Sequence, residues 1–358
     1  MEYRVLGSTG LEVSALGFGC IKFKRCTEEA VTAALHKALD LGVNYLDTAR
    51  NYGDSEEKIG RAVASRREEF VLSTKSASRS AGELLADLET SLGNLRTEVI
   101  DVLFLHTVSN PRTREQVFAP GGALEGARKA KEQGKIRHIG VSVHRDLDTL
   151  RRCIESGAFE VLMPACSVLD PEGSAALLPL AAAHNVGTVI MKPLSGGQLA
   201  SPPGPDGQPV SPDPVVGGAL RWVAYTPGVT TVIPGMIDAQ QVEDNVAAVE
   251  RGPLSEDERA ELLETIGGLG KAYRYGQQCL RCGYCQPCPE GIDIPEIFRA
   301  WDMARDYPDD LKHLGRELYE AQDYAAEQCV ECEQCVEKCP AGIDIPARLR
   351  DAAAFFNG

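Results

Sequence analysis

The fold of this chain is set by a unit that begins at residue 27, where Thr27–Thr48 reads TEEAVTAALHKALDLGVNYLDT. Its first part, Thr27–Asp40, carries apolar residues at helical spacing. Leu41-Gly42 then predicts the end of the helix, because glycine readily adopts the left-handed conformation in which many helices stop. The short run Asn44–Thr48 predicts a strand. The unit is therefore a helix followed directly by a strand.

The same alternation of strand and helix runs through residues 1–250. The expected strands are Ala15–Gly19, Asn44–Thr48, Phe70–Lys75, Val102–His106, Ile139–Ser142, Val161–Ala165, Gly187–Lys192 and Thr230–Gly235. Further helices are expected at Ala81–Leu95, Gly122–Gln133 and Ala239–Val249. Eight such strands predict an α/β fold, a closed (β/α)8 TIM barrel. An open doubly wound sheet is the alternative, but no glycine-rich phosphate fingerprint follows the first strand.

Three flanking segments complete the expected organisation. Tyr3–Leu6 and Leu11–Val13 predict a hairpin that covers the bottom of the barrel. The Pro- and Gly-rich stretch Ser201–Pro214 predicts a loop at its C-terminal mouth. Glycines at 267, 268 and 270 mark the expected boundary, so that residues 1–268 form the barrel and residues 269–358 a small, mainly helical second domain.

Composition and charge narrow the class of protein. The 358 residues are 43% hydrophobic and 25% charged, as in an ordinary globular protein. A formal net charge of −15 disfavours nucleic acid or an anionic membrane as partner. The sequence has neither a long apolar run nor a signal-peptide pattern at its start. We therefore expect a cytoplasmic protein whose thiols are kept reduced.

Eight of the twelve cysteines crowd into residues 279–288 and 329–339. The first run is C-x2-C-x2-C-x2-C-P and the second is C-x2-C-x2-C-x3-C-P, and each continues into a Gly-Ile-Asp-Ile-Pro sequence. This internal repeat predicts two equivalent sites. In a reducing compartment such spacing favours metal ligation over disulfides, and specifically two [4Fe–4S] clusters. Structural zinc is the alternative, but a four-cysteine zinc site wants two separated C-x2-C pairs.

In two-cluster ferredoxins the fourth cysteine of each run serves the other cluster. One expected ligand set is therefore Cys279, Cys282, Cys285 and Cys339, and the other is Cys329, Cys332, Cys335 and Cys288. The spacer Glu296–Gln328 has helical charge patterning. This part of the chain resembles the α-helical ferredoxin modules of multi-component redox enzymes.

Four ionisable residues fall at or just beyond predicted C-terminal strand ends, which in a barrel converge on the mouth. They are Asp47, Tyr52, Lys75 and His106. A tyrosine can protonate a developing alkoxide if a nearby cation lowers its pKa. Lys75 can supply that charge, Asp47 can hold the lysine, and His106 can orient or polarise the oxygen.

The first 250 residues resemble the aldo-keto reductases. The resemblance is carried by Met1–Gly19, Gly42–Gly60 (GVNYLDTARNYGDSEEKIG), the strands that bear Lys75 and His106, Gly134–Ser142 (GKIRHIGVS) and Thr231–Asn245. It implies that Tyr52 is the general acid and that Asp47, Lys75 and His106 complete a catalytic tetrad. It also implies hydride exchange between NAD(P)H and a small-molecule carbonyl or alcohol.

By the same resemblance, nicotinamide cofactor contacts fall at Ser142, Met163, Met191, Gly235, Gln241, Asp244 and Asn245. Ser142 and Asn245 match the family pattern, and Asp244 matches it in part. Met163 stands where glutamine is usual and Met191 where an aromatic ring is usual. Gly235 and Gln241 replace residues that commonly bind the adenosine 2′-phosphate.

The sequence thus predicts an oxidoreductase in which carbonyl–alcohol chemistry is linked, through two clusters, to a one-electron carrier protein. Nicotinamide passes two electrons and a cluster passes one, so a flavin is a further candidate cofactor. Two alternatives remain open: an electron-transfer subunit whose barrel is a docking scaffold, and a non-redox lyase or epimerase with structural clusters.

Overall fold

The structure is a computed structural model that describes residues 1–108, 110–144, 146–169, 174–200, 212–268, 279, 283–306, 312–339 and 342–358. The chain forms two compact units, Met1–Pro193 with Gly217–Leu254, and Leu194–Val216 with Ser255–Gly358. No helix in the described part of the chain is long and apolar enough to cross a membrane.

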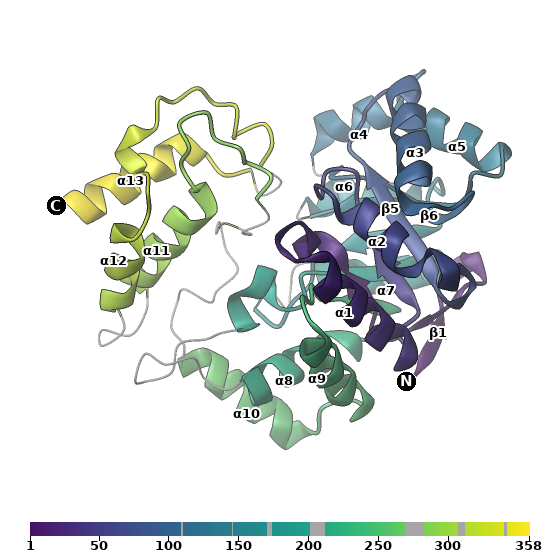
Figure 1. The fold of residues 1–358 in the computed structure, drawn as a ribbon, viewed down its shortest axis with the longest axis horizontal. Helices are drawn as coiled ribbons and strands as arrows, with labels where there is room; N and C mark the ends of the chain where they lie inside the picture. The colour runs from purple at the N-terminus through teal and green to yellow at the C-terminus, as the bar shows by residue number, and fades with distance from the viewer. Residues whose placement is uncertain are drawn as a thin grey trace. The chain divides into compact units, whose positions relative to one another are not determined.

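The first unit is a closed barrel of eight parallel strands (Figure 1). They are β3 (Phe18–Gly19), β4 (Tyr45–Asp47), β5 (Val71–Ser76), β6 (Ile100–Leu105), β7 (Ile136–Val143), β8 (Val161–Pro164), β9 (Gly187–Met191) and β10 (Thr231–Ile233). Neighbours in sequence pair with one another, and bridges Leu16↔Val232 and Gly19↔Gly235 join the last strand to the first. Each strand expected from the sequence is present, and the barrel prediction is confirmed.

Helices surround this barrel, as the sequence predicted (Figure 1). They are α1 (Glu28–Asp40), α2 (Ser55–Val63), α3 (Ala81–Leu95), α4 (Pro111–Phe118), α5 (Ala123–Glu132), α6 (Leu147–Glu155), α7 (Leu178–Ala183) and α9 (Ala239–Glu250). Helix α1 shows why the opening unit folds as it does: the Thr27 hydroxyl accepts a hydrogen bond from the Ala30 N–H at 3.3 Å, and Gly42 turns the chain at φ +81°.

Two further helices follow β9 and α9 in the chain. Helix α8 (Pro212–Ala224) begins inside the stretch Ser201–Pro214 that the sequence predicted as a loop, so its last three residues are helical. Proline is well tolerated in the first turn of a helix, where its missing N–H has no partner to lose. Residues 201–211 of that predicted loop lie outside the described residues. Helix α10 (Glu256–Gly268) belongs to the second unit.

The bottom of the barrel is covered by the predicted hairpin. Strands β1 (Tyr3–Val5) and β2 (Glu12–Ser14) pair antiparallel around the short helix η1 (Gly7–Thr9). Leu6 is fully buried and lies so close to Gly187, at the start of β9, that a Cβ on this glycine would be 2.7 Å from the leucine side chain. The hairpin therefore closes the end of the barrel where the strands begin.

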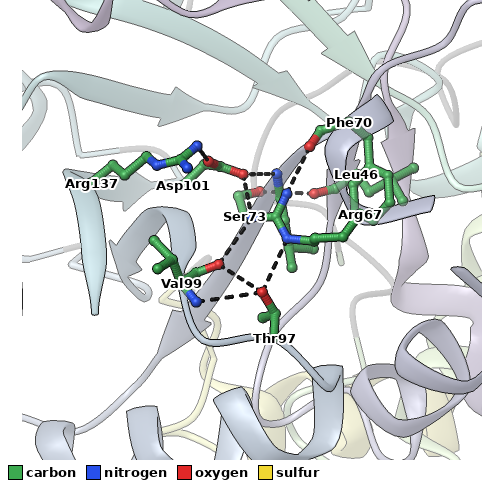
Figure 2. A network of polar contacts seen from close by, with 9 residues as sticks. Leu46, Arg67, Phe70, Ser73, Thr97, Val99, Asp101 and Arg137 are labelled. Carbon is green, nitrogen blue, oxygen red and sulfur yellow. Dashed lines mark hydrogen bonds and ion pairs between the residues drawn. The ribbon is translucent and has the colours of Figure 1, made fainter. Parts of the chain in front are cut away.

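A buried carboxylate ties three strand starts together at the same end (Figure 2). Asp101, the second residue of β6, accepts hydrogen bonds from Arg67 Nη2 at 2.6 Å and from the Leu72 N–H of β5 at 2.8 Å. Its other oxygen accepts from Arg137 of β7. Arg67 also donates to the backbone carbonyls of Phe70 and Val99. This network fixes β5, β6 and β7 at the barrel end opposite their C-terminal residues.

The second unit contains the cysteine repeats and is helical in its described part. Its elements include α11 (Ile294–Asp306), α12 (Lys312–Glu320), the short helix η8 (Ala326–Gln328) and α13 (Ile345–Asn357). The predicted helical spacer thus holds α11, α12 and η8. Large apolar side chains from α11 and α13, among them Ile297, Phe298 and Leu349, share one core with the cysteines.

The internal repeat is also a structural repeat. The two Gly-Ile-Asp-Ile-Pro segments lead into α11 and α13, and each begins with a left-handed glycine, Gly291 at φ +76° and Gly342 at φ +63°. In the second copy the Asp344 carboxylate accepts a hydrogen bond from the Ala347 N–H at 3.0 Å, and Asp293 accepts the equivalent bond at 3.3 Å. Each copy therefore ends its cysteine loop by capping a helix.

Candidate functional site

The barrel brings the four residues of the expected tetrad to its mouth. Asp47 is the last residue of β4, and Lys75 is the penultimate residue of β5. His106 follows β6 directly, and Tyr52 lies in the turn between β4 and α2. All four side chains are buried, with Tyr52 the most exposed at 7%. The tetrad is thus a compact group at the end of the barrel that carries active sites in this architecture.

A buried ion pair forms the base of this group. Lys75 Nζ donates to Asp47 Oδ2 at 2.5 Å and to the Thr48 carbonyl at 2.7 Å, while Ser73 Oγ donates to the other Asp47 oxygen at 2.7 Å. Burial is the largest influence on both groups: it raises the pKa of the Asp47 carboxyl and lowers the pKa of the Lys75 ammonium. The lysine is therefore a fixed cation that releases a proton more readily than a solvated one.

Tyr52 lies between this cation and an imidazole. Lys75 Nζ is 4.8 Å from the centre of the Tyr52 ring. The rings of Tyr52 and His106 meet edge to face, with their centroids 5.9 Å apart and an interplanar angle of 78°. A positive charge beside a phenol stabilises the phenolate that remains after proton donation. The arrangement suits Tyr52 to deliver a proton.

His106 is held in its neutral form. Burial lowers the pKa of the imidazole well below its usual value, and the positive charges of Lys75, Arg79 and Lys192 lower the pKa further. A neutral imidazole has one N–H, so it can donate a hydrogen bond to a substrate oxygen without carrying charge itself. In this electrostatic setting His106 is suited to polarise an oxygen rather than to transfer a proton.

A second buried carboxylate, which sequence reasoning missed, fixes the turn that carries Tyr52. Glu56 of α2 accepts hydrogen bonds from Thr74 Oγ1 and Ser91 Oγ, each at 2.7 Å, and pairs with Arg50 Nη1 at 2.6 Å. The Arg50 N–H also donates to the Lys75 carbonyl at 3.0 Å. The only signal in the sequence was a glutamate on the face of α2 that packs inward.

The residues that we expect around a nicotinamide lie at the C-terminal ends of three neighbouring strands. The Ser142 hydroxyl, near the end of β7, accepts a hydrogen bond from the Thr107 N–H at 2.8 Å. Met163 lies opposite Ser142 in the β7–β8 register and is buried, and Met191 ends β9. The three positions are therefore on one side of the mouth, but two of them offer a thioether rather than an amide or an aromatic ring.

The residues expected around an adenosine 2′-phosphate lie near the start of α9. Gly235 pairs with Gly19 just beyond β10, and Gln241 Oε1 accepts a hydrogen bond from the Ile237 N–H at 3.2 Å. Asp244 and the buried Asn245 follow on α9. None of these four expected contacts is a cation, so the set does not fit a 2′-phosphate.

Five of the eight cluster cysteines line one hollow in the second unit, namely Cys285, Cys288, Cys329, Cys332 and Cys335. Burial raises the pKa of the Cys335 thiol, and the charges of Cys329, Cys332 and Cys288 raise it further, so these four groups lie close to one another. They are the four residues that the sequence assigned to one cluster.

Only part of the other expected ligand set lies within the described residues. Cys279 and Cys339 pack against the same apolar core as four cysteines of the hollow, Cys285, Cys288, Cys329 and Cys335. Cys282 lies outside the described residues. Within the described ranges, no three Cys, His, Asp or Glu side chains converge closely enough to hold a single metal ion.

Two family models match the chain. The model described as "Aldo/keto reductase family" matches residues 15–216 and 209–266, and the model described as "4Fe-4S dicluster domain" matches residues 275–343. The first covers the residues of the tetrad. The second covers Cys279 to Cys339, and therefore all eight clustered cysteines.

Curated relatives and solved structures resemble the barrel. The chain is 29% identical over 285 residues to L-galactose dehydrogenase of Arabidopsis thaliana, covering 70% of this chain and 88% of the relative. It is 26% identical over 326 residues to L-glyceraldehyde 3-phosphate reductase of Escherichia coli K12, covering 74% and 92%. An aldo-keto reductase from Bacillus halodurans, in its holo form, matches with a TM-score of 0.62 and 29% identity, covering 74% of this chain and 96% of that one.

Proposed function

Because the chain belongs to the aldo/keto reductase family, we propose that it interconverts a carbonyl and an alcohol at the Asp47/Tyr52/Lys75/His106 tetrad. The observation that carries this proposal is the position of Lys75, which is paired with Asp47 at 2.5 Å and lies 4.8 Å from the Tyr52 ring centre. Such a cation gives a phenol the acidity that carbonyl reduction needs. The tetrad is thus an oxidoreductase site with Tyr52 as its general acid.

Each side chain has a distinct part in the reduction. The neutral His106 donates a hydrogen bond to the carbonyl oxygen, and Tyr52 gives its hydroxyl proton to that oxygen as a hydride equivalent reaches the carbon. The product is the alcohol, and the phenolate left behind is stabilised by Lys75. Asp47 and Ser73 hold the ammonium in place. Oxidation of the alcohol runs through the same groups in reverse.

A nicotinamide would be held beside this tetrad by Ser142, with Met163 and Met191 on the neighbouring strands. When bound, it would supply the hydride. The expected contacts at Gly235, Gln241, Asp244 and Asn245 favour a cofactor without a 2′-phosphate, because none of them is a cation. Met163 and Met191 stand where the family has an amide and an aromatic ring that contact the nicotinamide, and the loss of these contacts favours a second source of electrons.

We assign that second source to the dicluster domain, whose ligands we propose as Cys279, Cys282, Cys285 and Cys339 for one cluster and Cys329, Cys332, Cys335 and Cys288 for the other. The hollow that gathers Cys288 with Cys329, Cys332 and Cys335 supports the second set. When bound, two clusters that each pass one electron would together supply the two electrons of one carbonyl reduction, while Tyr52 would give one proton to the oxygen and water the other to the carbon. A one-electron carrier protein would exchange electrons with them.

The test of the tetrad is Tyr52→Phe, which removes the hydroxyl and keeps the ring. Turnover should fall by roughly 10²–10⁴-fold, the usual contribution of a general acid, while cluster content and unfolding temperature stay unchanged. Tyr3→Phe is the matched control, because Tyr3 is exposed and its hydroxyl bonds only to the Gly42 carbonyl in the described contacts. Near-full activity in Tyr52→Phe would show that Tyr52 is not the general acid and would overturn this mechanism.

A further inference from the structure

Arg79 is a cation at the barrel mouth whose charge has no counterpart in the described part of the chain. It lies in the turn between β5 and α3. Its Nη2 donates to the Thr107 carbonyl at 3.1 Å, while its Nη1 is buried without a hydrogen-bond partner among the described residues. Burial alone lowers the pKa of its guanidinium, with no neighbouring carboxylate to raise it again.

Arg79 is half-buried, and burying its cationic Nη1 without a hydrogen-bond partner costs free energy, so this arrangement needs an explanation. The backbone of Arg79 is held in place, because the Ala123 N–H donates to the Arg79 carbonyl at 2.9 Å. The next two residues are fixed as well, through the Ser80↔Gly122 bridge and a 2.8 Å bond from the Ala81 N–H to the Gly121 carbonyl. The side chain is therefore presented by a rigid turn.

This turn presents Arg79 to the catalytic group. The carbonyl that Arg79 binds belongs to Thr107, the residue after His106, and the Thr107 N–H bonds to Ser142. Thr107 takes a left-handed backbone conformation, φ +55°, which a β-branched residue rarely adopts. A strained backbone conformation persists only where the surrounding structure fixes it, and such conformations often lie beside functional sites. Arg79 is thus linked through one residue to His106.

Arg79 also lines an open hollow beside the catalytic turn. The hollow is lined by Arg50, Asn51, Ala77, Ser78, Arg79, Glu83 and Asp87. Arg50 is already paired with Glu56. The two carboxylates of the hollow accept hydrogen bonds from serine hydroxyls, Glu83 from Ser80 and Asp87 from Ser76 and Ser78. These hydroxyl donors leave the negative charges of Glu83 and Asp87 in place, and Arg50 Nε lies 4.0 Å from Asp87. Arg79 is the cation of this hollow that forms no ion pair among the described residues.

We propose that Arg79 binds an oxyanion group of the substrate, so that this chain acts on a small carbonyl or alcohol that bears a carboxylate or a phosphate. The inference rests on the proposed function of the tetrad. An arginine fork recognises either group through paired hydrogen bonds. An anion at Arg79 would anchor the substrate on the Thr107 side of His106 and leave the carbonyl within reach of Tyr52.

The test compares matched charged and neutral aldehydes: glyceraldehyde 3-phosphate with glyceraldehyde, and succinic semialdehyde with butanal. The wild type should prefer at least one charged probe. Arg79→Met should lower kcat/KM for that probe by roughly 10- to 100-fold, mainly through KM, and lower kcat/KM for its neutral partner by much less. Arg79→Lys should recover part of the loss. Arg112→Met, which removes an exposed arginine of α4, is the control.

Calorimetric titration of the holoprotein with oxalate and with inorganic phosphate gives a readout that needs no turnover. Binding of either anion by the wild type, lost in Arg79→Met, supports the proposal even if none of the aldehydes is reduced, in which case the proposed function fails alone. Unchanged discrimination between charged and neutral probes in Arg79→Met would overturn the proposal. The proposal would also be overturned if Arg79→Met raised KM for the nicotinamide cofactor and left KM for the charged substrate unchanged.

Discussion

At the scale of single residues, the electrostatics of His106 make a prediction about pH. Its pKa lies well below the usual 6.5 because burial and three neighbouring cations oppose protonation. The imidazole therefore stays neutral as pH falls from 7 to 5.5, and it contributes no acidic limb to the pH profile of kcat/KM. His106→Gln should be slower at every pH with a profile of the same shape on the acidic side.

The measurement is kcat/KM between pH 5.5 and 8, over a range in which the iron content of the protein is constant. An acidic limb near pH 6.5 in the wild type that disappears in His106→Gln would show that His106 carries a proton in this range. That outcome would contradict the role of a neutral hydrogen-bond donor that we assign to it.

The convergence of Asp47, Tyr52, Lys75 and His106 at the barrel mouth could be predicted from the sequence, because each sits at, or just beyond, a strand end. The side chains that support it could not. Glu56 meets Thr74, Ser91 and Arg50, which come from different elements, and no spacing in the sequence encodes that meeting. Arg79 stands out only once its partners are known, because an arginine in a loop is ordinarily solvated.

At the scale of elements, the eight strands were predictable because each is a short apolar run, but their ends were not. Strand β6 begins at Ile100, two residues before the expected Val102, and β7 begins at Ile136 rather than at Ile139. The two early residues pair with one another, Ile100↔Ile136. Strand ends are thus set by the register between neighbours, which a single run does not contain.

The Asp101 network makes a prediction about the stability of the barrel. Asp101→Asn removes the negative charge that Arg67 and Arg137 share at the strand starts (Figure 2). Loss of one partner from a buried pair should lower the free energy of unfolding of the barrel by about 2–4 kcal/mol. Tetrad chemistry should be unaffected, because the network lies at the opposite end of the strands.

Denaturant unfolding followed by circular dichroism measures this effect. Asp148→Asn is the matched control: Asp148 also bonds to two arginines, Arg114 and Arg152, but it is exposed. The control should leave the unfolding midpoint unchanged. Equal midpoints for the wild type and Asp101→Asn would show that the buried network does not stabilise the barrel.

At the scale of the whole molecule, the sequence predicted both parts of the chain for different reasons. The barrel followed from repeated strands, and the second part from cysteine spacing, which depends on ligand chemistry rather than on packing. The boundary between the barrel and the second part is harder to predict from the sequence. We keep the boundary at residues 268 and 269 as a prediction, while α10 (Glu256–Gly268) groups with the second compact unit.

The cluster assignment predicts the metal content. Anaerobically purified protein should carry about eight iron and eight sulfide per chain. Cys288→Ser and Cys332→Ser should each damage the same cluster and spare the other, although the two cysteines come from different runs. Cys26→Ser, in the barrel, is the control. Iron analysis with electron paramagnetic resonance would decide, and loss of different clusters in the two variants would refute the crossed assignment.

The central claim is that carbonyl chemistry at the tetrad is coupled to the clusters, and one anaerobic experiment tests it most directly. The clusters are reduced, excess reductant is removed, glyceraldehyde 3-phosphate is added, and cluster oxidation is followed by absorbance and electron paramagnetic resonance. We predict oxidation at the rate of turnover, with one alcohol formed for every two electrons lost, and no oxidation in Tyr52→Phe. Clusters that stay reduced while the wild type reduces the same aldehyde at full rate with NADH would contradict the claim.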